Sequence, residues 1–118
     1  MFRTTIFAAA TLAFAAVPAV AQGKQDFRLT NATGYDIAEV YVAPTSSDDW
    51  EEDVMGEDTL DNGESVNIHF APKDKQCVYD VRVVWTDGDE ADWRKFDLCT
   101  VSHITLYWNN GKATAEYE

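Results

Sequence analysis

Apolar and polar residues alternate over several short stretches between residue 25 and the C-terminus. This period of two is typical of β-strands that bury one face. The stretches are 25–31, 36–43, 65–71, 79–86, 91–98, 101–108 and 113–117. Turn-forming pairs separate several of them: Thr33-Gly34, Asn62-Gly63, Asp87-Gly88 and Asn110-Gly111. We therefore predict an all-β fold, a small antiparallel β-sandwich of about seven strands.

The segment from Cys77 to Cys99 predicts a hairpin whose two strands meet at Asp87-Gly88. In its second strand the apolar positions change sides near Arg94, which predicts a β-bulge or a bend there. The two cysteines are the only ones in the chain and lie at the open ends of the hairpin. We expect them to form a structural, cross-strand disulfide, worth roughly 3 kcal/mol by loop entropy.

The first 21 residues have the pattern of a secretory signal peptide. Arg3 precedes an apolar run from Ile6 to Val20, and an Ala-x-Ala site ends at Ala21. The run is too short to span a membrane comfortably. We expect cleavage after Ala21, which leaves a single domain at 22–118 without a membrane span. The short, Ala-rich leader and the disulfide indicate a bacterial protein that is periplasmic or secreted.

The composition is strongly acidic, with 9 Lys and Arg against 21 Asp and Glu and a formal net charge of −12. Loss of Arg3 with the leader leaves 8 basic side chains and a net charge of −13. Such a surface repels nucleic acid and anionic lipid, whereas cations and basic partners are attracted. We expect a monomer that binds no nucleic acid.

Nine of the carboxylates fall within residues 46–64, which we call the acidic segment. No Lys or Arg occurs anywhere in 29–72. The segment has three interpretations. The first is a solvated insertion, either a loop or a short helix that Ser47 or Asp48 could cap and Gly56 stop. The second is a Ca²⁺ site, and the third is a docking surface for a basic partner.

A calcium site would use carboxylate oxygens, which hard divalent cations prefer. The candidate ligands are Asp48, Asp49, Glu51, Asp53, Glu57 and Asp58. Their spacing is not that of an EF-hand, because the sixth position counted from Asp49 is Val54, where the turn requires glycine. The sequence therefore leaves Ca²⁺ binding as a hypothesis beside the other two.

Motifs for catalysis are absent from the sequence. The two histidines, His69 and His103, lie at outward positions of predicted strands. Ser102 precedes His103, but neighbours in a strand point to opposite faces and cannot form a catalytic pair. The chain has no G-x-S-x-G, H-E-x-x-H or phosphate-binding glycine loop. We therefore predict no catalytic residues.

The four tryptophans and five tyrosines are predicted to fill the core, because aromatic side chains bury the most area; the alternative is a platform for a carbohydrate or a peptide. The exception we expect is Trp93, exposed next to Arg94 and Lys95, the one compact cationic spot of an acidic protein. With Trp50 of the acidic segment, Trp93 and Arg94 form a candidate binding surface.

Several motifs occur in a fixed order along the chain. They are N-x-T-G-Y-x-I-x-E-V-Y-V, DDWEEDVMG, L-x-x-G-E-S-V, C-x-Y-D-x-R-V-V, D-G-x-E-A-x-W, F-D-L-C and V-S-x-I-T-L. This order resembles a family of small exported bacterial proteins without an established biochemical role. Some members of that family carry the label argininosuccinate lyase, so the resemblance implies lyase activity as an alternative function.

The residues themselves do not carry lyase chemistry. Enzymes of that superfamily are large helical tetramers with a G-S-x-x-M-P-x-K-x-N loop that bears the catalytic serine. This chain has Met55-Gly56 but no G-S-x-x-M segment, and it is far shorter. We therefore favour a non-enzymatic binding or interaction module.

Overall fold

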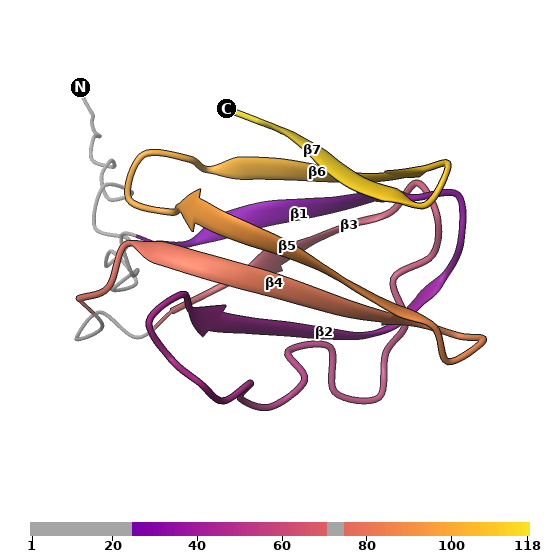
Figure 1. Ribbon diagram of the computed structural model, residues 1–118, viewed down its shortest axis with the longest axis horizontal. Helices are drawn as coiled ribbons and strands as arrows, with labels where there is room; N and C mark the ends of the chain where they lie inside the picture. The colour runs from indigo at the N-terminus through magenta and orange to yellow at the C-terminus, as the bar shows by residue number, and fades with distance from the viewer. Residues whose placement is uncertain (1–24, 71–74) are drawn as a thin grey trace, which may run out of the picture.

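Seven strands form two facing sheets in the computed structural model, which describes residues 25–70 and 75–118 (Figure 1). The strands are β1 (Phe27–Ala32), β2 (Ile37–Pro44), β3 (Ser65–Ile68), β4 (Val78–Trp85), β5 (Glu90–Asp97), β6 (His103–Asn109) and β7 (Lys112–Tyr117). Cleavage after Ala21 lies outside the described residues. Within those residues no helix is present, and hence none that could span a membrane.

The strands have the order β3-β1-β6-β7 in one sheet and β2-β4-β5 in the other. This confirms the predicted all-β sandwich. One pair departs from the antiparallel prediction, because β1 and β6 run parallel, with Leu29 opposite Ile104. The chain returns from the second sheet to enter β6, so this pairing joins strands that are distant in sequence. Turn-forming residues predict pairing only between consecutive strands, so they could not predict the pairing of β1 with β6.

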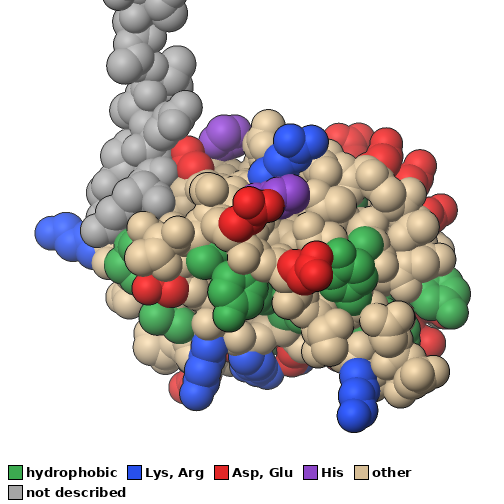
Figure 2. All heavy atoms as spheres, turned by 90° about the horizontal axis from the view of Figure 1, so that it is seen from above, with side chains coloured by type: hydrophobic (Ala, Val, Ile, Leu, Met, Phe, Trp, Pro, Cys, Tyr) green, Lys and Arg blue, Asp and Glu red, His purple; other side chains and the backbone are tan. Residues whose placement is uncertain are grey.

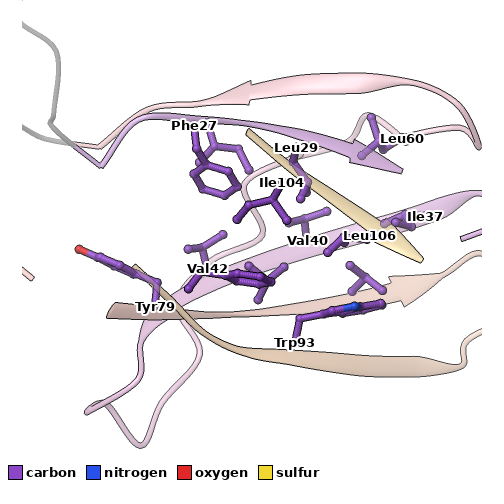
Figure 3. Close-up of a cluster of buried hydrophobic side chains, with 14 of the residues drawn as sticks. Phe27, Leu29, Ile37, Val40, Val42, Leu60, Tyr79, Trp93, Ile104 and Leu106 are labelled. Carbon is purple, nitrogen blue, oxygen red and sulfur yellow. The ribbon is translucent and has the colours of Figure 1, made fainter. Parts of the chain in front are cut away.

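The core lies between the sheets and is built from the inward positions of the alternating pattern (Figure 3). Seven of its residues are 0% exposed: Leu29, Ile37, Val40, Val81, Val83, Ile104 and Leu106. In β1, for example, Phe27 and Leu29 are buried whereas Arg28 is exposed. The sequence predicted this face correctly.

The predicted disulfide and bulge are both present in the β4–β5 hairpin. Cys77 and Cys99 are bonded, with their Cα atoms 5.2 Å apart. Beyond them Tyr79 pairs with Phe96, but Val81 pairs with Trp93. Because one residue of β4 then faces two residues of β5, the second strand carries a bulge.

The acidic segment lies along the free edge of β2 as a loop, which is one of the two forms predicted for it, and the alternative of a short helix after Ser47 is not formed. Its backbone instead continues the hydrogen bonding of the sheet. The N–H of Val54 donates to Val40 O at 2.8 Å, and Ile37 and Leu60 exchange two bonds of 2.9 Å. Covering an exposed strand edge in this way removes a site for unwanted pairing.

Candidate functional site

The six candidate calcium ligands do not converge in the structure. Asp53 is half-buried, and its Oδ1 accepts the backbone N–H groups of Val40 at 2.8 Å and Met55 at 2.9 Å. The other five are exposed: Asp48, Asp49, Glu51, Glu57 and Asp58. Ca²⁺ takes about six to eight oxygen ligands, and these dispersed carboxylates do not supply such a set. The two hydrogen bonds that Asp53 accepts instead hold the acidic segment on β2.

Metal-ligating atoms do come together at one place in the described ranges 25–70 and 75–118. Cys77, Asp97 and Cys99 each offer a ligand atom there within 4.8 Å of the others. The two sulfur atoms are bonded to each other, so they cannot act as thiolate ligands. No other group of three such side chains, and none from the acidic segment, meets this distance within those ranges.

Trp50 and Arg94 of the candidate binding surface do lie together, on the outer face of the β2-β4-β5 sheet. The guanidinium carbon of Arg94 is 5.7 Å from the centre of the Trp50 ring, and that of Arg82 is 4.9 Å away. Both are cation–π contacts. They attach the acidic segment to the sheet through a side chain as well as through its backbone.

The two arginines are neutralised by the aspartates beside them. Arg82 holds Asp92 through two nitrogens, at 2.7 and 3.1 Å. Arg94 donates to Asp80 and Asp92, each at 2.8 Å. The hydrogen bond from Arg82 is the main reason that the pKa of Asp92 lies below its ordinary value, despite partial burial. Two cations thus face two carboxylates, so this spot is no anion-binding surface.

Trp93 was expected on that surface and is instead buried, with 4% of its area exposed, so this prediction is wrong. It lies opposite Val81 on the inward face, just before the bulge. Its Nε1–H donates to the backbone oxygen of Thr114 at 2.8 Å, across the sandwich in β7. A shift of one residue in the bulge decides which side chain of this stretch points inward.

A cavity of about 530 Å³ opens at one end of the sandwich, and we call it the end cavity. It is lined by Tyr35, Trp85, Asp87, Gly88, Asp89, Glu90 and Trp108. These residues come from the β1–β2 turn, the β4–β5 hairpin and the C-terminal end of strand β6, which meet at the right-hand end of Figure 1. Carboxylates also gather along the right-hand edge of the molecule in Figure 2.

Sequence reasoning missed the end cavity, although part of its signal was visible. Three carboxylates lie within Asp87 to Glu90, two residues after Trp85, and Trp108 precedes the Asn109-Asn110-Gly111 turn. Each pattern by itself indicates only a hairpin. Placing the two tryptophans against each other requires the parallel β1–β6 pairing, which the sequence did not predict.

His103 contacts Thr30, whereas the possible partner considered from the sequence was Ser102. Its Nε2 lies 2.8 Å from the hydroxyl of Thr30, which is also 2.7 Å from the hydroxyl of Ser65. On its other side, Nδ1 is 3.9 Å from a carboxylate oxygen of Glu118, longer than a hydrogen bond. The network links β3, β1 and β6 on an outer sheet face, with a carboxylate too distant to orient the imidazole as a catalytic base.

Comparison of the chain with protein-family models, with curated proteins and with solved structures found no match. The resemblance seen in the sequence motifs therefore remains an expectation. The described side chains offer two features on which a function can be based, the acidic segment and the end cavity. Both present negative charge.

Proposed function

We propose that this protein is an exported, non-enzymatic binding module that recognises a basic partner through its acidic segment. The observation that carries this proposal is that the nine carboxylates of the acidic segment have no ion pairs with Lys or Arg among the described residues. In the ranges 25–70 and 75–118, no Lys or Arg lies within 4.0 Å of any of them. The ion pairs of Arg82 and Arg94 are made with carboxylates of β4 and β5. The segment thus keeps an unneutralised negative potential.

The same segment is held in place, which favours binding over passive solvation. Asp53 and Leu60 fix it to β2, and Trp50 fixes it to the outer face of the sheet. A surface ordered before binding loses less conformational entropy when a partner docks. Fixed negative charge also accelerates the encounter with a positively charged partner, in a manner that weakens with salt.

Export is the second part of the proposal. The disulfide between Cys77 and Cys99 supports it, because disulfides persist in oxidising compartments such as the periplasm or the exterior. A wholly solvated acidic segment would leave the charge and the rigid attachment of the segment unused. Docking of a basic partner uses both the charge and the rigid attachment.

The binding proposal is tested with labelled oligolysine and the chain from residue 22, by fluorescence anisotropy at several salt concentrations. Any acidic protein attracts such a peptide, so the test must show where on the surface the peptide binds. Glu51→Gln/Glu52→Gln should weaken binding about fivefold more than the charge-matched control Glu116→Gln/Glu118→Gln. All four side chains are exposed. Equal losses in the two variants, or no binding at low salt, would contradict docking on the acidic segment.

The non-enzymatic part is tested by assaying fumarate release from argininosuccinate with the same chain. We expect no activity above the blank, because His103 lacks an aligned carboxylate. Activity that disappears in His103→Ala would overturn this part and support the lyase alternative.

A further inference from the structure

The end cavity has aromatic walls with different orientations. The rings of Trp85 and Trp108 have centroids 5.2 Å apart and are tilted by 58°. The rings of Tyr35 and Trp85 are 6.4 Å apart and nearly perpendicular, at 75°. Rings set at such angles enclose a space instead of forming a flat platform. Their negative faces attract cations at short range.

The walls are fixed by contacts behind them. Trp85 is 5% exposed, and its Nε1–H donates to the buried hydroxyl of Thr33 at 3.0 Å. The backbone oxygen of Tyr35 accepts a hydrogen bond of 2.8 Å from the buried Asn31. Trp93 packs against the inner side of Trp85, with centroids 6.5 Å apart. The cavity is therefore formed before any ligand arrives.

Tyr35 is the exception to this burial. Its side chain lies at the mouth of the cavity with 60% of the residue exposed, one of the few large apolar side chains left in water among the described residues. Covering it would release solvent from an aromatic surface that folding has not buried. A ligand seated in the end cavity, which Tyr35 lines, would do this.

The rim of the cavity carries Asp87, Asp89 and Glu90. In the described parts of the chain, no Lys or Arg lies within 4.0 Å of Asp87 or Asp89, and the nearest cation to Glu90 is Arg82 at 3.9 Å. The backbone of Asp89 is fixed by a bond of 2.9 Å to the carboxylate of Asp87. Negative charge at the mouth and aromatic faces inside together favour a cationic group and exclude an anion.

The three carboxylates do not form a metal site, because they do not approach one another within 4.8 Å. A metal ion would also gain nothing from the apolar walls. An ammonium group on an alkyl stem suits both parts of the cavity: the charge meets the carboxylates, and the methylene groups lie against the accessible rings of Tyr35 and Trp108.

We propose that the end cavity binds the side-chain ammonium of a lysine presented by the basic partner. This inference rests on the proposed function and assigns it a second, specific contact. The acidic segment supplies attraction at long range, whereas the end cavity supplies a short-range contact for an alkylammonium group.

The test follows the indole N–H signals of Trp85 and Trp108 in ¹H–¹⁵N NMR spectra of the chain from residue 22. The probe is Nα-acetyl-lysine methylamide, and a single side chain is expected to bind with a Kd of about 1 mM. Both signals should shift in a saturable manner. The Nε-acetylated lysine, the norleucine analogue and glucose should produce no saturable shift. Equal shifts with any of these neutral compounds would overturn recognition of the ammonium charge.

Substitutions in the end cavity distinguish a loss of lysine binding from a loss of folded structure. Tyr35→Leu and Asp89→Asn should each weaken lysine binding about fivefold, the size of one cation–π or charge contact. Tyr35→Phe keeps the ring and should bind as the unmodified chain does. Both residues are exposed, so the substitutions should leave the remaining spectrum unchanged. If Tyr35→Leu and Asp89→Asn both bind lysine as the unmodified chain does, the end cavity is not the lysine site.

The same variants distinguish this inference from the proposed function. If oligolysine still binds through Glu51 and Glu52 while lysine shifts neither indole signal, the pocket is wrong and docking on the acidic segment stands. If Tyr35→Leu weakens oligolysine binding and Glu51→Gln/Glu52→Gln does not, the pocket stands and docking on the acidic segment falls.

Discussion

The buried carboxylate of Asp80 accepts the backbone N–H of Lys95 at 2.9 Å, at the position where β5 carries one residue more than β4. The same carboxylate accepts the hydroxyl of Thr45 at 2.6 Å and the guanidinium of Arg94 at 2.8 Å. Asp80 thus supplies an acceptor where the bulge interrupts the ladder between the strands.

Asp80→Ala should lower the free energy of unfolding by about 2–3 kcal/mol, because it leaves a backbone N–H and a hydroxyl without their acceptor. Asp80→Asn retains an oxygen acceptor and should cost less. Urea denaturation of the three chains measures the difference. A loss below about 0.5 kcal/mol in Asp80→Ala would contradict the role assigned to this carboxylate.

The pH dependence of stability should include a contribution from Asp80. Burial raises its pKa, but the hydrogen bonds from Thr45, the Lys95 N–H and Arg94 lower it more, so its pKa lies below the ordinary 3.8. A carboxyl with a lowered pKa stabilises the folded state above its unfolded pKa. That contribution is lost as the pH falls below 3.8 towards the folded pKa.

Denaturation midpoints measured between neutral pH and the acid limb give this contribution. The midpoint of Asp80→Asn should fall less steeply below pH 3.8 than that of the unmodified chain. Parallel acid limbs in the two chains would show that Asp80 does not contribute to the acid sensitivity.

Lys95→Gly should stabilise the protein by about 0.5–1 kcal/mol, because Lys95 has a φ of 65°, a left-handed conformation that glycine adopts without cost. Asn110 provides a matched control, with a φ of 51°. Asparagine tolerates this region better than lysine, so Asn110→Gly should gain only a few tenths of a kcal/mol. Thermal unfolding measures both. A lower Tm for Lys95→Gly would mean that its side chain stabilises the bulge.

Reduction of the disulfide should destabilise the protein by about 3 kcal/mol, since the bond closes a loop with a sequence separation of 22. The backbone bond from Leu98 to Cys77 holds the same end of the hairpin, so strand pairing should persist in the reduced chain. Urea denaturation with and without reductant measures the effect. The variant Cys77→Ala/Cys99→Ala should not respond to reductant, which controls for other effects of the reagent.

Ca²⁺ and EDTA should give the same Tm, because no three of the six candidate ligands converge within the described ranges. A site filled at about 100 times its Kd would add about 2.7 kcal/mol and produce a clear upward shift. A Ca²⁺-dependent shift that disappears in Asp48→Asn/Asp49→Asn would reinstate the calcium hypothesis for the acidic segment.

The strands, turns and disulfide could be predicted because each depends on residues close in sequence. Alternation placed Phe27 and Leu29 in the core, and the change of sides near Arg94 indicated the bulge. The alternating pattern could not predict which residue forms the bulge. Lys95 takes the left-handed conformation, and Trp93 is therefore the last inward side chain before it instead of an exposed one.

The candidate site was less predictable, because it depends on contacts between distant elements. Trp85 and Trp108 belong to different sheets, and only the packed sandwich brings them together. The neutralised arginines present the same problem. Sequence shows Arg94 within a cationic cluster, whereas cross-strand register supplies Asp80 and Asp92 as its partners.

The parallel pairing of β1 with β6 determines when this molecule can complete its fold. β1 lies between β3 and β6, so the first strand of the domain lacks one neighbour until the chain has been synthesised as far as Asn109. Pairing over such a sequence separation is slow, because a long loop must close before any contact rewards it. A nascent chain would therefore complete the four-stranded sheet, and with it the sandwich, only late in its synthesis.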